Sequence, residues 1–105
     1  MPLITAASIT TGESETDATS YATASITPSA NKLVLAMVLA NSDPGNTPTA
    51  SGNGLTWVEV ATANTADSRN TLTMFRAMGA SPGAGAITFD FGAQTKSRAV
   101  WSVVE

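Results

Sequence analysis

The chain has 105 residues, 12% of them charged, a formal net charge of -3, and neither cysteine nor histidine. At this length we expect one domain, covering residues 1–105. Without histidine or cysteine there is no histidine-dependent triad, no thiol nucleophile, and no thiolate or imidazole metal site. The chain holds five Lys and Arg residues, too few to indicate binding to nucleic acid. The composition therefore indicates neither an enzyme nor a bound metal or cofactor.

The beginning of the chain does not resemble a secretory signal peptide, because residues 1–10 lack a basic segment and their apolar residues are interrupted by polar ones. The longest apolar run covers residues 33–40, far short of the roughly 20 residues needed to span a bilayer. We therefore expect a soluble protein that is made in the cytoplasm, is not exported and does not bind a membrane.

Gly, Pro, Asn and Asp interrupt the chain at short intervals, and the segments between them are rich in Thr, Val, Ile and aromatic residues. Short strands separated by turns in this way are typical of antiparallel sandwiches and barrels. Seven strands are predicted, in chain order at residues 3–10, 20–27, 32–40, 55–61, 71–78, 86–91 and 96–104. The expected fold is all-β: an antiparallel β-sandwich of about seven strands, jelly-roll-like or Ig-like.

Two of these strands have the clearest patterns. In residues 32–40 both alternating sets of side chains are apolar, which predicts a central strand covered on both sides. In residues 86–91 the three positions Ile87, Phe89 and Phe91 alternate with polar residues, so they are expected to point inward. Residues 41–54 are predicted to form a long loop, with Asp43 as a turn residue.

The sequence stops inside the last predicted strand, residues 96–104, with no turn after it. A strand at the end of a sheet offers unpaired backbone groups to another chain. Two interpretations remain open: the domain is incomplete at its C-terminal strand, or this strand completes its pairing in an assembly.

Acidic side chains are the only general acids or hard metal ligands that the sequence offers. Glu13, Glu15 and Asp17 alternate along the chain, so a strand would place their carboxylates on one face. Such a cluster could begin a calcium site, but we favour a solvated acidic loop. A glycosidase needs only two carboxylates, yet a small sandwich leaves little material for a substrate cleft, so we do not favour that activity.

Three aromatic residues, Tyr21, Trp57 and Trp101, raise the question of sugar binding. Exposed on one face, they would stack on sugar rings, and Trp57 and Trp101 are the candidate stacking residues. We favour the alternative that both tryptophans fill the space between the sheets, because large aromatic side chains dominate the cores of small domains.

Four segments together carry a resemblance to a known family: residues 20–38, 51–58, 75–79 and 99–105. They resemble a β-sandwich module of tailed-bacteriophage virion proteins, which include head decoration (cement) and tail-associated proteins. The resemblance implies a non-enzymatic structural protein of the virion. Its implied partners are other copies of itself and phage capsid or tail proteins.

Assembly contacts are expected at the two apolar ends of the chain, residues 1–10 and 99–105, where we predict unpaired backbone. The predicted contact residues are Leu3, Ile4, Trp101, Val103 and Val104. Few charges on the surface would lower the desolvation cost when copies pack together. The alternative function is a carbohydrate-binding module of a phage fibre or of a secreted protein, with a glycan as its ligand.

Overall fold

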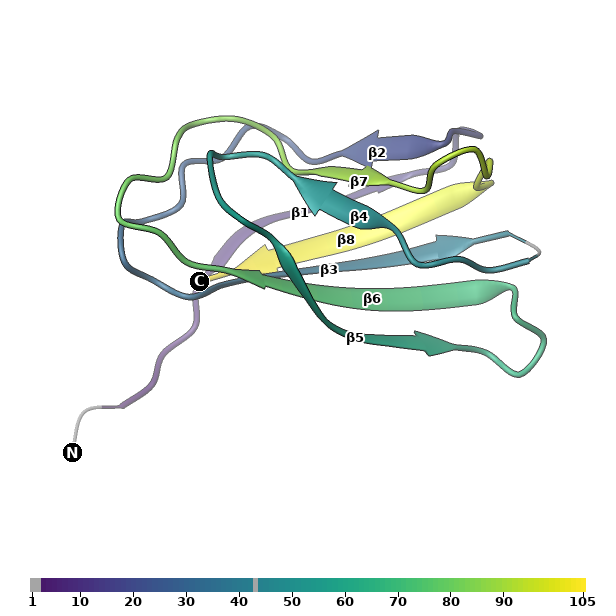
Figure 1. The fold of residues 1–105 in the computed structure, drawn as a ribbon, viewed down its shortest axis with the longest axis horizontal. Coiled ribbons are helices and arrows are strands. Elements are labelled where there is room, and N and C mark those ends of the chain that lie inside the picture. Colours follow the sequence, from purple (N-terminus) through teal and green to yellow (C-terminus); the bar gives the residue numbers. More distant parts are fainter. Residues whose placement is uncertain (1–2, 43) are drawn as a thin grey trace.

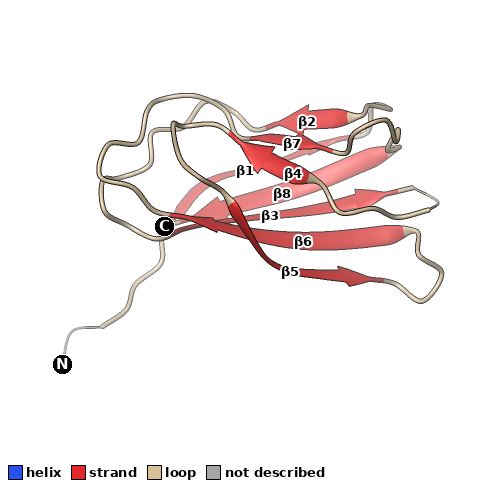
Figure 2. Cartoon of the chain, viewed as in Figure 1, coloured by secondary structure: helices blue, strands red, loops and turns tan. Residues whose placement is uncertain are grey.

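A computed structural model describes residues 3–42 and 44–105 of the chain. These residues form strands and loops, and none of them lies in a helix (Figure 2). Accordingly, this part of the chain has no helix long and apolar enough to cross a membrane. The strands in chain order are β1 (Ser8–Ser14), β2 (Ser20–Ala22), β3 (Val34–Asn41), β4 (Thr49–Ser51), β5 (Val58–Asn64), β6 (Asn70–Ala77), β7 (Thr88–Asp90) and β8 (Arg98–Val104).

The strands form two antiparallel sheets that pack face to face, which confirms the predicted β-sandwich (Figure 1). The larger sheet has five strands in the order β1-β8-β3-β6-β5, and the smaller has three in the order β2-β7-β4. Short three-residue strands build the whole smaller sheet. It covers one face of the larger sheet, and none of the described strands covers the opposite face (Figure 1).

The core lies between the two sheets and is built from alternate residues of the strands. Ile87, Phe89 and Phe91 are all buried there, as their alternation predicts. The Phe89 ring lies 6.2 Å from the ring of Phe75 in β6, so aromatic packing connects the two sheets. The other buried hydrophobic residues of this cluster are Tyr21, Ile26, Val34, Ala36, Val38, Ala40, Ala99, Trp101 and Val103.

Several predicted strand positions need correction. The strand predicted at residues 20–27 ends at Ala22, and the one predicted at residues 55–61 lies at Val58–Asn64. The first strand begins at Ser8, and residues 3–7 precede it, although Ala7 still exchanges two backbone hydrogen bonds with Glu105. The expected loop at residues 41–54 contains β4, which raises the number of strands to eight. Residues Thr49, Ala50 and Ser51 show no apolar alternation that would predict a strand. They form β4 because they pair with β7. Asp43, the predicted turn residue, lies outside the described residues, as do Met1 and Pro2.

The prediction that β3 is a central strand is confirmed, because β3 pairs with β6 on one side and β8 on the other. The prediction that both of its faces are covered is wrong. Val34, Ala36 and Val38 are buried in the core, whereas Leu39 on the other face is 39% exposed. The second sheet covers only one face of β3.

The prediction of an unpaired C-terminal strand is also wrong. β8 lies inside the larger sheet and is hydrogen-bonded to β1 along one side and to β3 along the other. Glu105 after it is also held, since its carboxylate accepts hydrogen bonds from the backbone N–H and the hydroxyl of Ser29. The edges of the larger sheet are β1 and β5.

One glycine makes room for the largest core side chain of β8. Gly12 in β1 faces Trp101, and a Cβ atom at Gly12 would lie 2.7 Å from the indole Nε1. We therefore expect Gly12→Val to lower the free energy of unfolding by about 1–3 kcal/mol, despite the strand propensity of Val, because overpacking displaces the indole. Chemical denaturation followed by tryptophan fluorescence measures this. Thr11→Val, at the exposed neighbouring position, should be almost neutral, and equal effects of the two substitutions would contradict the expectation.

Candidate functional site

The most unusual feature of the molecule is the uncovered face of the larger sheet, which we call the outer face. All five strands of this sheet contribute to it, and its centre is formed by the residues of β3, β6 and β8 that alternate with the core residues. On a sheet that meets water, these positions are normally polar. Here they are mainly apolar over three rows: Leu35, Met37, Leu39, Leu72, Met74, Arg76, Val100, Ser102 and Val104. The row at one end is polar and consists of Asn41, Asn70 and Arg98.

Strand register arranges these side chains in rows across the sheet. Leu39 lies opposite Leu72 on one side and Val100 on the other, and the last two are each 45% exposed. In the next row, Met37 lies opposite Met74 and Ser102. Neighbours in one row are about 4.8 Å apart, so the apolar side chains form one continuous patch. Contiguous exposed apolar patches mark interaction surfaces in soluble proteins.

The outer face is hollowed at two places on either side of Leu72 and Met37. One hollow, of about 170 Å³, also contacts Leu39, Val100, Trp101 and Ser102. The other, of about 140 Å³, is lined by Ala61, Thr62 and Ala63 of β5 together with Met74. The first hollow is the more open one, as expected where a partner's side chains pack rather than where a substrate is enclosed.

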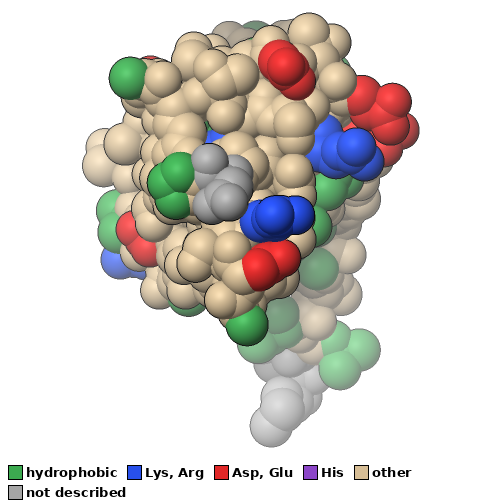
Figure 3. Space-filling view, turned by 90° about the vertical axis from the view of Figure 1, so that its right-hand side faces the viewer, with side chains coloured by type: hydrophobic (Ala, Val, Ile, Leu, Met, Phe, Trp, Pro, Cys, Tyr) green, Lys and Arg blue, Asp and Glu red, His purple; other side chains and the backbone are tan. Residues whose placement is uncertain are grey.

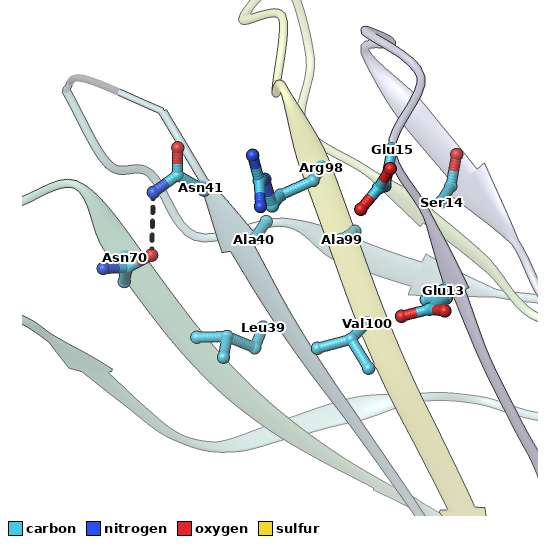
Figure 4. Close-up of a pocket in the computed structure, with 10 residues that line it drawn as sticks. All are labelled: Glu13, Ser14, Glu15, Leu39, Ala40, Asn41, Asn70, Arg98, Ala99 and Val100. Carbon is cyan, nitrogen blue, oxygen red and sulfur yellow. Dashed lines mark hydrogen bonds between the residues drawn. The ribbon is translucent and has the colours of Figure 1, made fainter.

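A third hollow, of about 230 Å³, lies at the end of the outer face where β1 begins to leave the sheet (Figure 4). Leu39 and Val100 form its apolar part, and Arg98 lies beside them. Glu13 in β1 and Glu15, just after the end of β1, face it from the other side. Among the described residues, no carboxylate lies within 4.0 Å of the Arg98 guanidinium. The hollow thus combines an apolar floor with a rim that carries both signs of charge.

Figure 3 looks onto the end of the sandwich where the loop between β5 and β6 lies. There Lys and Arg side chains lie next to Asp and Glu side chains, and the hydrophobic side chains in view are scattered over a mostly uncharged surface. Neither sign of charge dominates it. The outer face is therefore the stronger candidate for a functional surface.

The predicted contact residues fall into two groups. Leu3 and Ile4 are 88% and 102% exposed, and Val104 lies half-buried on the outer face, so these three side chains are accessible to a partner. Trp101 and Val103 are 8% and 0% exposed, and they pack in the core. The reason for choosing the last two, an unpaired terminal strand, does not hold for β8.

The two tryptophans do not form an open platform for a sugar. Trp101 is enclosed between the sheets. Trp57 is half-buried against the core, and its indole N–H donates a hydrogen bond of 3.1 Å to the carbonyl oxygen of Gly52. Because Trp101 is buried, it cannot stack on a glycan in this structure. Stacking of Trp57 on a glycan stays a prediction.

The favoured prediction of a solvated acidic loop is wrong for Glu13, which lies in β1, whereas Glu15 and Asp17 follow that strand. Glu13 and Glu15 lie on the same rim of the outer face. Within residues 3–42 and 44–105, no three acidic side chains are close enough together to hold a metal ion. Glu13 and Glu15 therefore form a charged border along the apolar face.

Comparison with known proteins finds no family model, no curated protein and no solved structure that matches this chain.

Proposed function

We propose that this chain is a non-enzymatic structural protein that assembles by packing its outer face against other subunits, as a capsid decoration or tail-associated protein of a virion does. The observation that carries the proposal is the continuous apolar patch on the outer face. The resemblance of its strand and turn segments to phage virion proteins supports the virion as its location. The other copies of the chain are its first expected partners.

The energetics favour contacts through the outer face. Burial of apolar surface contributes about 25 cal/mol for each Å² removed from water. Leu39, Leu72 and Val100, all partly exposed, would gain this stabilisation together when a partner covers them. The middle of the patch holds no charged residue, so covering it costs little desolvation.

Strand addition at the sheet edges is less favourable. Both edge strands contain a bulge, β1 between Ser8 and Thr10 and β5 between Glu59 and Ala61. Both edges also carry carboxylates, among them Glu13 and Glu59. Bulges and charges are the features by which natural sheets prevent pairing with another chain. The outer face has no such protection.

The proposal is tested by sedimentation of the protein over a concentration series into the high micromolar range. We expect species heavier than the 10.7 kDa monomer. Leu72→Asp should weaken this association at least tenfold, because it places an unpaired carboxylate in the middle of the interface. A strictly monomeric wild type would overturn the proposed function.

Two further variants locate the contact. Ala22→Asp adds the same charge to β2 in the opposite sheet and should leave the association unchanged. Ile4→Asp tests the predicted contact at the beginning of the chain. Loss of association with Ala22→Asp but not with Leu72→Asp would place the interface on the other side of the sandwich.

A further inference from the structure

We infer that the outer face is self-complementary, so that a second copy packs on it about a two-fold axis and Arg76 of each copy pairs with Glu13 of the other. This inference rests on the proposed function and names its partner and geometry. Its basis is the position of the charged residues around the apolar patch.

Arg76 and Glu13 lie diagonally across the outer face, on opposite sides of the apolar patch. Arg76 in β6 lies opposite Leu35, one row beyond Met37 toward one end of β3. Glu13 in β1 lies opposite Val100, which in turn lies opposite Leu39, one row beyond Met37 toward the other end. Among the described residues, neither of these two charged groups has an ion-pair partner within 4.0 Å.

The register gives approximate positions for these residues. On a flat grid the strands are about 4.8 Å apart, and successive residues of one face are about 6.8 Å apart along a strand. The midpoint between Arg76 and Glu13 then falls beside Met37, on the side of Ser102. This is the middle of the apolar patch.

A two-fold axis through that midpoint, in the plane of the face and about 45° from the strands, exchanges Arg76 with the partner's Glu13. Both symmetry-related pairs form at once, one on each side of the apolar patch. The strands of the two faces then cross at about 90°, which is one of the two common arrangements of packed sheets.

The same axis places apolar side chains against apolar side chains. It passes close to Leu72, which therefore meets the partner's Leu72. Leu39 falls between the partner's Leu72 and the partner's Met74. Val100 falls on the partner's Met74. The single operation that pairs Arg76 with Glu13 thus also covers the centre of the patch, and this agreement favours a second copy over an unrelated partner.

The size of the face agrees with a stable dimer. Five strands about 4.8 Å apart and about eight residues long give a flat area of about 650 Å². An interface of standard size buries about 800 Å² of accessible surface on each partner. Because side-chain relief makes accessible surface larger than the flat area, the outer face provides enough for such an interface.

Reversal of the charges tests the inferred geometry through the dimer dissociation constant, measured by sedimentation equilibrium. Arg76→Glu and Glu13→Arg should each weaken the dimer about a hundredfold, because each disrupts two symmetry-related pairs worth about tenfold apiece. The double variant, Arg76→Glu with Glu13→Arg, restores the opposite charges and should bind within about threefold of the wild type. Both side chains are exposed, so each variant is expected to fold.

Arg69→Glu is the matched control, since it reverses an exposed charge in the loop between β5 and β6 and should leave the constant unchanged. If the wild type associates but Arg76→Glu binds as tightly, or the double variant binds no better than the single ones, the inferred geometry is wrong and the proposed function stands. A monomeric wild type would refute both.

Discussion

Replacing Phe89 by Ala should lower the free energy of unfolding by about 3–5 kcal/mol, the largest effect that we expect from a single substitution. Phe89 is fully buried and lies at the centre of β7, where it pairs with Tyr21 of β2 and Ala50 of β4. Its ring also packs near that of Phe75 in the larger sheet. The substitution therefore removes the contact that fixes the small sheet to the large one.

The consequence for the fold follows from the size of the small sheet. Each of its strands has three residues, so their backbone hydrogen bonds alone cannot hold it in place. Domains of this kind are stable by about 5–15 kcal/mol in total. Urea denaturation measures the loss, with Thr88→Ala as the control at the adjacent position outside the core. A loss below about 1 kcal/mol would show that the core repacks around the missing ring.

The strands of this fold could largely be predicted from local patterns. Ile87, Phe89 and Phe91 alternate with polar residues, and such alternation requires only that one face of a strand is buried. The order of the strands could not be predicted in this way. β1 and β8 are neighbours although they lie at opposite ends of the chain, and nothing in the local sequence of either specifies the other. The mistaken edge position of β8 has this origin.

The outer face shows more clearly what the sequence pattern of a strand cannot predict. Leu35, Met37 and Leu39 are apolar on the second face of β3, and that pattern predicts that this face is covered. The prediction carries an assumption, namely that the covering layer belongs to the same chain. Within residues 3–42 and 44–105, the chain supplies a covering sheet for one face only. A strand with two apolar faces and only one partner sheet is therefore evidence for an interaction surface.

The second large effect concerns a lysine inside the domain. Lys96 is fully buried, its Nζ donates a hydrogen bond of 2.9 Å to the Ser42 hydroxyl, and it lies 5.0 Å from the centre of the Phe91 ring. Burial removes water from the ammonium group and lowers the pKa of Lys96. We expect Lys96→Met to raise the free energy of unfolding by about 1–3 kcal/mol at neutral pH, because Met fills similar space without a charge.

The pH dependence gives an independent measure of the same group. Between the lowered pKa of folded Lys96 and its usual value when unfolded, the unfolded state holds more protons, so the stability of the wild type should rise with pH. Burial raises the pKa of Tyr21, whose hydroxyl donates to the carbonyl oxygens of Thr16 and Lys96. Above about pH 10 the unfolded phenol ionises first, and stability should fall.

The contributions of Lys96 and Tyr21 can be separated by denaturation curves of the wild type and of two variants, collected from neutral pH to about pH 11. Each variant should remove one part of the plot of unfolding free energy against pH. Lys96→Met should abolish the rise and keep the fall, whereas Tyr21→Phe should keep the rise. A wild-type profile without an alkaline rise, or a Lys96→Met variant less stable than the wild type, would mean that the bond to Ser42 and the contact with Phe91 outweigh the cost of burying the charge. In that case Lys96 stabilises the sandwich as a cation.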